Sequence, residues 1–239
     1  MTASSSIASA LSTSTPVTVR CKGVLFDMDG ILISSLGSVE RSWHAWAVSR
    51  DVDPALAIQT AHGRRAIETV KILRPDLDDE AELKYIEDLE LADNEGLAVL
   101  PGVIALLAAL PARRWTVVTS ATERLARIRL AAGGVPVPEC IITADQVTSG
   151  KPHPEPYLKG ASILGFPAAD CVVFEDSGSG TQAGRAAGCT VIGTTFSHSV
   201  ADLAAAHYLV TDLTGISVEV LTGDEGLVLH FTPLALGVL

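Results

Sequence analysis

Two aspartates separated by one residue follow the first apolar run of the chain. Residues 23–26 are apolar, and Asp27, Met28, Asp29 and Gly30 come directly after them. In an open parallel sheet, ligands bind beyond the carboxyl ends of the strands, so this position suits a nucleophile, an acid–base group or a metal ligand. Aspartate and glycine also favour turns, and the pair taken alone fits an acidic turn equally well.

Three further polar elements occupy similar places along the chain. Residues 119–122 follow a second apolar run, where they would either cap a helix or hold an anion. Lys151 stands before a proline-rich turn and is either a solvated loop lysine or a cation aimed at an anion. Glu175 and Asp176 end another apolar run, in a place equivalent to that of Asp27. Several carboxylates buried together need a neutralising cation, and their oxygen ligands suit Mg²⁺.

The elements that would position these side chains form an alternating pattern. Short apolar runs predict strands at residues 23–26, 115–119, 140–143, 171–174, 190–193 and 208–210. Helical patterns lie between them, at residues 103–110, 122–132, 157–164 and 181–187. This alternation predicts an α/β fold, with a parallel sheet covered on both faces by helices. The polar elements would then share one edge of the sheet.

One long segment, residues 38–94, interrupts the alternation because it carries no strand pattern. Within it, residues 64–74 have apolar side chains at helical spacing before Pro75 ends the pattern, and residues 80–92 predict a second helix. The segment follows the first strand directly. We therefore expect a small helical cap inserted into the α/β core after that strand.

The same reasoning gives the expected domain organisation. Residues 37–97 form the cap in this interpretation, and residues 18–36 together with 98–239 form the core. Residues 1–17 are rich in Ser, Thr and Ala and predict a loose tail. Residues 217–230 include two glycines flanked by apolar residues, which favours a hairpin.

Composition excludes several classes of protein. With 28 acidic and 17 basic residues the net charge is −11, which argues against a nucleic-acid binder. Hydrophobic residues make up 48% of the chain and charged residues 19%, so its body is not disordered. No apolar run approaches the roughly 18 residues of a membrane span. The first fifteen residues contain no basic side chain and match no targeting signal.

The four cysteines are far apart in the sequence and form no C-x-x-C pair. They are Cys21, Cys140, Cys171 and Cys189, and most stand beside apolar or β-branched residues. This pattern favours buried free thiols over a zinc site or a disulfide framework. We therefore expect a reducing, cytoplasmic location.

Taken together, the four polar elements resemble the motifs of the haloacid dehalogenase superfamily of phosphatases. The matching residues are Asp27-x-Asp29-Gly30, Ser120, Lys151 and Glu175-Asp176, within residues 22–212. Residues 62–65, 101–103, 115–120, 150–160 and 174–176 are similar to the glycerol-3-phosphate and 2-deoxyglucose-6-phosphate phosphatases of that superfamily. The resemblance implies a Rossmann-like core with a small helical cap. Ile31 and Ser34 depart from the usual pattern, which has Thr and Asp there.

The resemblance also implies a role for each motif residue. Asp27 would attack phosphorus and form an aspartyl phosphate, and Asp29 would serve as general acid and then general base. Ser120, the backbone amide of Ala121 and Lys151 would hold the transferring phosphoryl group.

The implied metal ligands and substrate contacts come from the same residues and from the cap. Mg²⁺ would be held by Asp27, the main-chain carbonyl of Asp29 and Asp176, with Glu175 in or next to the shell. In the cap, His62 and Arg65 are expected to meet the polar end of the substrate when the cap closes.

The expected activity is therefore Mg²⁺-dependent hydrolysis of small phosphomonoesters such as glycerol 3-phosphate or 2-deoxyglucose 6-phosphate. A phosphoryl transferase of the β-phosphoglucomutase type would use the same four motifs and remains an alternative, as does a non-catalytic sensor of a phosphorylated metabolite. A dehalogenase is less favoured because carbon–halogen displacement needs no second carboxyl at Asp29. The expected partner is a small phosphorylated metabolite, with neither nucleic acid nor membrane, and the expected state is a monomer or small homo-oligomer.

Overall fold

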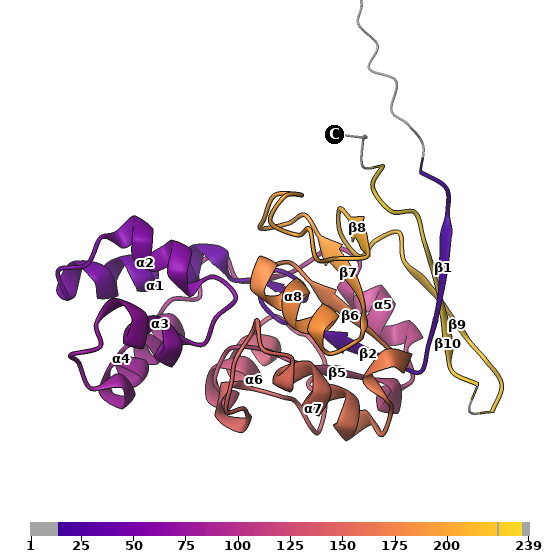
Figure 1. Ribbon diagram of the computed structural model, residues 1–239, viewed down its shortest axis with the longest axis horizontal. Helices are drawn as coiled ribbons and strands as arrows, with labels where there is room; N and C mark the ends of the chain where they lie inside the picture. Colours follow the sequence, from indigo (N-terminus) through magenta and orange to yellow (C-terminus); the bar gives the residue numbers. More distant parts are fainter. Residues whose placement is uncertain (1–13, 224, 236–239) are drawn as a thin grey trace, which may run out of the picture.

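The computed structural model describes residues 14–223 and 225–235. Its centre is a five-stranded parallel sheet, with four helices set to one side of it (Figure 1). The strand order is β5-β2-β6-β7-β8, with β5 at Trp115–Val117, β2 at Gly23–Phe26, β6 at Cys171–Glu175, β7 at Thr190–Thr194 and β8 at Tyr208–Val210. The α/β fold with a parallel sheet is confirmed.

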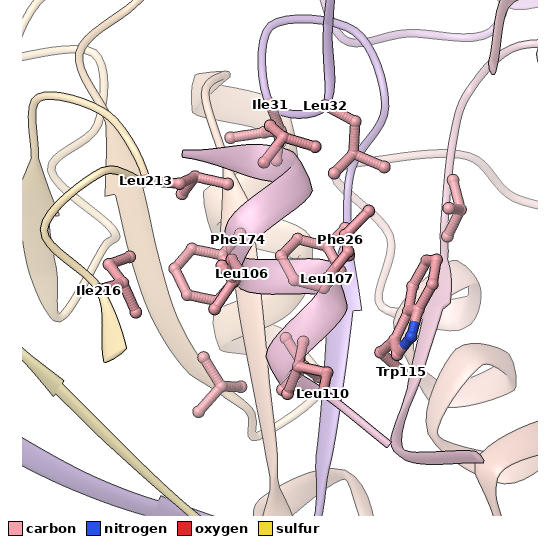
Figure 2. Packing of buried hydrophobic residues seen from close by; sticks show 14 of the residues in the cluster. Phe26, Ile31, Leu32, Leu106, Leu107, Leu110, Trp115, Phe174, Leu213 and Ile216 are labelled. Carbon is pink, nitrogen blue, oxygen red and sulfur yellow. The ribbon is translucent and has the colours of Figure 1, made fainter. Parts of the chain in front are cut away.

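Helices cover both faces of this sheet, which explains why its strands are apolar throughout. The covering helices are α5 at Val103–Ala109, α6 at Glu123–Ala132, α7 at Glu155–Leu164 and α8 at Gly178–Ala186. Successive residues of one strand point to opposite faces, so Phe26 enters one hydrophobic cluster and Leu25 the other. Figure 2 shows the first cluster, in which the Phe26 ring stacks on Phe174 with ring centroids 5.1 Å apart, next to Trp115 and α5.

One expected strand does not form. Residues 140–143 make a single bridge, between Ile142 and Val118. The carbonyl of Cys140 accepts a hydrogen bond from the Thr116 hydroxyl instead of from a strand amide, and Thr143 caps the short helix η2 (Ala144–Gln146). The segment therefore turns away after one pair.

The cysteines are free thiols, as the sequence suggests, but not all are buried. Cys21, Cys171 and Cys189 are buried, and burial raises the pKa of all three thiols. Cys140 is exposed, so its predicted burial is wrong. The reason is the missing strand, since residue 140 lies on a surface loop instead of inside the sheet.

A second sheet with antiparallel pairing lies at the far side of the core. It contains β1 (Val17–Cys21), β10 (Leu227–Phe231) and β9 (Ser217–Val220), in the order β1-β10-β9. The predicted hairpin at residues 217–230 is thus confirmed as β9 and β10. The strand β1 was not predicted, and the expected tail therefore ends before Val17. Its first thirteen residues lie outside the described part of the chain.

The cap consists of four helices with a hydrophobic centre of their own. These are α1 (Leu36–Ser49), α2 (Pro54–Ala61), α3 (Ala66–Leu73) and α4 (Asp79–Ala92), which enclose Trp43, Trp46, Val70 and Ile86. The predicted helices at 64–74 and 80–92 are confirmed as α3 and α4. The chain enters and leaves the cap through β3 (Ile33–Ser34) and β4 (Ala98–Val99), which pair with each other. Among the described residues, no helix is long and apolar enough to cross a membrane.

Candidate active site

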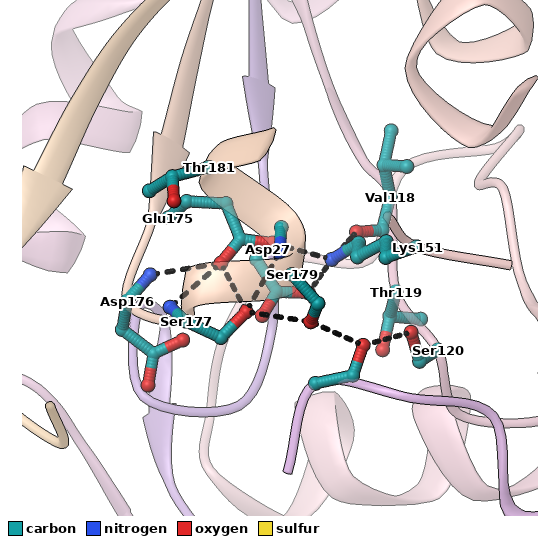
Figure 3. Close-up of polar contacts among 12 residues, drawn as sticks. Asp27, Val118, Thr119, Ser120, Lys151, Glu175, Asp176, Ser177, Ser179 and Thr181 are labelled. Carbon is teal, nitrogen blue, oxygen red and sulfur yellow. Dashed lines mark hydrogen bonds and ion pairs between the residues drawn. The ribbon is translucent and has the colours of Figure 1, made fainter. Parts of the chain in front are cut away.

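Lys151 and Asp27 meet at the carboxyl ends of the central strands. Asp27 follows β2, and its backbone amide donates to Phe174 on the neighbouring strand β6. The Lys151 ammonium donates to Asp27 Oδ1 at 2.7 Å, to Glu175 Oε1 at 2.7 Å and to the Val118 carbonyl at 3.2 Å (Figure 3). Lys151 is thus a buried cation with three oxygen partners, and not a solvated loop lysine.

The local charge explains why this lysine stays charged although it is buried. Burial disfavours an ammonium, but the carboxylates of Asp27 and Glu175 outweigh that effect and raise the pKa of Lys151. The Tyr157 ring lies 5.2 Å from the ammonium and adds a favourable cation–π contact. The loop that precedes Lys151 is held in place because Glu155 accepts hydrogen bonds from the backbone amides of Thr148 and Ser149.

Glu175 holds the lysine and the following loop in place. One of its oxygens accepts from Lys151 and the Tyr157 hydroxyl, and the other accepts from the amides of Asp176 and Ser177. Burial favours the protonated form, but Lys151 and these donors lower the pKa of Glu175 below its usual value. A Cβ at Gly180 would lie 1.6 Å from Glu175 Oε1, so the start of α8 needs glycine there.

A buried acidic cluster next to the lysine is suited to a metal ion. Asp27, Glu175 and Asp176 are all buried, and one ligand atom from each lies within 4.8 Å of the others. Burial raises the pKa of Asp27 to about 7, and burial together with Glu175 and Asp27 raises that of Asp176 well above its usual value. One ammonium is therefore too little positive charge for three carboxylates, and a hard divalent cation would balance the site.

Glycine at position 30 lets the first acidic pair approach this cluster. Its φ is +79°, and a Cβ there would lie 1.8 Å from Asp176 Oδ2. The second aspartate of the pair points elsewhere: Asp29 Oδ1 accepts from Ser35 Oγ and, at 3.2 Å, from Arg129 Nη1. The acidic cluster thus does not include the Asp29 side chain, which lies in the pocket toward the cap.

Ser120 and Ala121 lie at the end of β5, where the sequence places them. Ser120 Oγ donates to the Gly63 carbonyl of the cap at 3.2 Å, and Ser179 donates to the same carbonyl (Figure 3). The Ala121 amide donates to Thr119 Oγ1. The helix cap is a different residue, Thr122, whose hydroxyl accepts from the Leu125 amide.

The two expected cap residues are placed differently from each other. His62 lies in the pocket with its Nε2 buried and without a hydrogen bond among the described residues, and its ring is 5.5 Å from that of His198. Burial and His198 lower the pKa of His62. Arg65 donates instead to the carbonyls of Val147 and Thr148, at 2.7 and 2.8 Å, and so joins the cap to the loop before Lys151.

A pocket of about 250 Å³ between cap and core connects these groups. The predicted residues that line it are Asp27, Asp29, His62, Arg65, Ser120, Ala121 and Asp176. Sequence reasoning missed Ser35, Glu90, Arg129 and His198, which line it as well. Only Arg129 left a signal in the sequence, because it stands on the apolar face of α6, four residues after Leu125.

The amino-acid sequence of this chain is similar to those of known hydrolases. A family model described as haloacid dehalogenase-like hydrolase matches residues 21–188. The chain is 42% identical over 182 residues to hexitol phosphatase A of Escherichia coli, an alignment that covers 73% of this chain and 83% of the relative. It is 36% identical over 198 residues to glycerol-1-phosphate phosphohydrolase 2 of Saccharomyces cerevisiae, covering 77% and 79%.

Solved structures give the same fold at lower sequence identity. A hydrolase from Pseudomonas syringae superposes with a TM-score of 0.73 at 23% identity, over 81% of this chain and 94% of that one. The resemblance expected from the four motifs is confirmed.

Proposed function

The chain belongs to the haloacid dehalogenase-like hydrolase family, and we propose that it is a phosphatase that hydrolyses small sugar or polyol phosphates. The observation that carries the proposal is the buried contact of Lys151 with Asp27, a carboxylate that lines the pocket. Support also comes from the two relatives described above, which are named as phosphatases of hexitol and glycerol phosphates. The substrate is then a small phosphorylated metabolite, and we propose a cytoplasmic location.

Asp27 is the proposed nucleophile. Its carboxylate attacks phosphorus, the bond from phosphorus to the ester oxygen breaks, and an aspartyl phosphate forms. Lys151 already touches Asp27, so it is placed to offset charge on the transferring oxygens, together with Ser120 and the Ala121 amide at the same sheet edge.

Asp29 is the proposed acid and base. Its carboxyl gives a proton to the departing alkoxide, and its carboxylate then takes a proton from the water that attacks the aspartyl phosphate. Inorganic phosphate leaves and Asp27 is restored. Asp29 suits this role because Ser35 and Arg129 hold its side chain in the pocket that Asp27 also lines.

Mg²⁺ is the proposed metal. Asp27, Asp176 and the Asp29 carbonyl would hold it, with Glu175 in or next to the shell, and it would neutralise the carboxylates so that an anionic ester can approach. The raised pKa values of Asp27 and Asp176 support this assignment, because those two acids need a cation to lose their protons readily.

Residues 37–97 are proposed as a cap that selects the substrate, over a core of residues 18–36 and 98–239. Gly63 supports this division, since its carbonyl sits over Ser120 and Ser179 and so brings the cap against the proposed phosphate site. His62 precedes that residue directly, and Arg65 follows two positions later. We propose that His62 contacts the substrate, and that Arg65 does so when its contacts to the core loop are released.

Phosphate release from a substrate panel tests the proposal. The panel contains glycerol 1-phosphate, glycerol 3-phosphate, sorbitol 6-phosphate, 2-deoxyglucose 6-phosphate and β-glucose 1-phosphate, with Mg²⁺ or with a chelator. We expect metal-dependent release from the polyol or sugar phosphates, and none from the Asp27→Asn variant. Conversion of β-glucose 1-phosphate to glucose 6-phosphate without phosphate release, when a glucose bisphosphate primer is supplied, would instead establish a transferase. Inactivity in both assays would contradict an enzymatic role.

A further inference from the structure

A buried charged pair between core and cap lines the pocket, and the proposed mechanism uses only one nitrogen of it, Arg129 Nη1, which holds Asp29. Arg129 lies on α6 of the core and Glu90 on α4 of the cap, which Figure 1 shows on facing sides of the two parts. The two helices contact each other. Arg129 Nη2 is 3.6 Å from Glu90 Oε2, and the two side chains are only 3% and 9% exposed. Both line the pocket.

This pair is incompletely satisfied. Arg129 Nη2 is buried and makes no hydrogen bond within the described part of the chain, because 3.6 Å is too long for one. Burial raises the pKa of Glu90 to about 7 in spite of Arg129. A buried guanidinium nitrogen without a partner is costly, and such groups usually have a ligand or a water to bind.

A second buried carboxylate on the same helix shows what full pairing looks like. Glu82 accepts from Trp46 Nε1 at 2.7 Å and from two nitrogens of Arg50 at 2.9 and 3.0 Å. It is absent from the lining of the pocket, whereas Glu90 is part of it. Of these two buried carboxylates on α4, the one that is incompletely paired, Glu90, is therefore also the one that a ligand in the pocket can reach.

The position of Arg129 identifies the part of the ligand that it meets. Its Nη1 donates to Asp29, and Asp29 is proposed to protonate the ester oxygen that leaves. Arg129 reaches Asp29 from α6 of the core, and its other terminal nitrogen is directed at Glu90 of the cap, so the space beside this pair is next to the carbon chain attached to that oxygen. Arg129 and Glu90 thus face the leaving group and not the phosphoryl group.

The chemistry of the pair narrows the class of leaving group. Arg129 offers only donors and Glu90 mainly acceptors, which together match hydroxyl groups, since each hydroxyl both donates and accepts. The Asp29, Glu87 and Glu90 carboxyls line this part of the pocket. Glu87 is paired with Arg124, and Arg129 is the one buried arginine in the described part of the chain. A second anionic group on the substrate would be repelled there, whereas an uncharged hydroxylated chain would not.

We propose that Arg129 and Glu90 form a hydroxyl-binding site that selects uncharged polyol or sugar chains over leaving groups that lack hydroxyls or carry a second anion. This inference rests on the proposed phosphatase activity and deepens it. It makes both side chains specificity-determining residues.

The test compares two esters of similar length, glycerol 3-phosphate and propyl phosphate, which lacks hydroxyls. We expect Glu90→Gln and Arg129→Met each to lower kcat/KM for glycerol 3-phosphate about tenfold or more, the loss of one hydrogen bond to a charged group. For Glu90→Gln we expect kcat/KM for propyl phosphate to stay within about threefold of wild type, because Glu90 touches only the leaving group in this proposal. Phosphoglycolate, with its second anion, should be a poor substrate of the wild-type enzyme.

Two matched variants control for helix and fold effects. Arg127→Met removes an exposed arginine from α6 that pairs with Glu123, and Glu82→Gln changes the buried carboxylate of α4 that is outside the pocket. Both should leave the ratio of kcat/KM between the two esters unchanged. If Arg129→Met fails to fold, Glu90→Gln decides the question alone.

The possible failures are distinguishable. Equal losses on both esters in the Glu90→Gln variant would overturn the hydroxyl-binding site and leave the phosphatase intact, as would efficient wild-type hydrolysis of phosphoglycolate. Absence of phosphate release from every ester by the wild-type enzyme would instead overturn the proposed function.

Discussion

The two ends of the pocket differ in how completely their polar groups are paired. At the core end, Lys151 has three oxygen partners and both oxygens of Glu175 accept hydrogen bonds, so these groups are fixed without a substrate. At the cap end, His62 Nε2 and Arg129 Nη2 are buried and make no hydrogen bond among the described residues. The fold thus supplies a preorganised site for the phosphoryl group, which is the same in every phosphate ester. The leaving group, which differs between esters, is left to side chains that can still form hydrogen bonds.

The difference also concerns where the groups come from. The core end is built from residues that end neighbouring strands of one sheet, so their spacing is set by the sheet itself. The cap end depends on how α4 and α6 face each other across two separate hydrophobic centres. Substitutions at the two ends should therefore have different consequences, and four of them test this contrast.

The largest effect is expected from Asp27→Asn. The amide cannot attack phosphorus as a carboxylate does, so we expect kcat to fall by a factor on the order of 10⁴ or more. The melting temperature should not fall, because the variant removes a buried charge. Phosphate release and thermal unfolding measure the two outcomes, and turnover close to wild type would rule out Asp27 as the nucleophile.

The next effect is expected from Lys151→Met, which should lower both activity and stability. We expect kcat to fall by about 10²- to 10³-fold, as for the loss of one charge-stabilising group. Asp27 and Glu175 would lose their buried cation, which should cost about 3 kcal/mol or more in the free energy of unfolding. Urea unfolding without metal measures this cost. Lys159→Met is the control, since Lys159 is an exposed partner of Glu155, and an equal loss in both variants would contradict the argument.

A smaller effect is expected for Mg²⁺ affinity as a function of pH. The pKa of Asp27 is raised to about 7, so below pH 7 a proton occupies the carboxyl that the metal needs. Affinity should rise with pH, by about tenfold per unit below pH 7 for each proton displaced, and less steeply once Asp27 is ionised. Titration calorimetry between pH 5.5 and 8 measures the trend. An affinity that is independent of pH would mean that the cluster binds no cation through Asp27.

The smallest effect is expected at the contact between cap and core. Arg65→Ala removes hydrogen bonds to the carbonyls of Val147 and Thr148, so we expect kcat/KM to fall about tenfold while stability of the core is kept. His62→Ala should have a similar effect through loss of a substrate contact. Lys71→Ala is the control for Arg65, because Lys71 is exposed on the same helix. Unchanged kcat/KM for every ester in both test variants would remove Arg65 and His62 from the site.

The core end of the pocket was predictable from the sequence for a physical reason. Strands buried on both faces are apolar throughout, so the polar residues that follow them are easily located, and parallel strands bring such residues to one edge. This placed Asp27, Ser120, Lys151 and Glu175 near one another. The strand expected at residues 140–143 was wrong because the Thr116 hydroxyl takes the carbonyl that a ladder would use.

The cap end of the pocket was less predictable because it depends on how the helical cap packs against the core. Arg65 was expected to face the substrate, yet besides its neighbour Glu68 it donates to two carbonyls that lie more than 80 residues away, on a core loop. Glu90 and Arg129 belong to separate helices, and no local pattern tells which pairs will meet. The arginine on the apolar face of α6 was the one visible sign, and it indicates a buried charge without naming its partner.

The paired strands β3 and β4 have a consequence for how such enzymes diversify. Ile33 pairs with Val99 and Ser34 with Ala98, so the two connections to the cap leave the core side by side. The entropy cost of closing an insertion between two adjacent ends grows only with the logarithm of its length, by about 0.6 kcal/mol for each doubling. Inserts of quite different size and shape could therefore be grafted at this point, by recombination or by a protein engineer, while the core is left undisturbed.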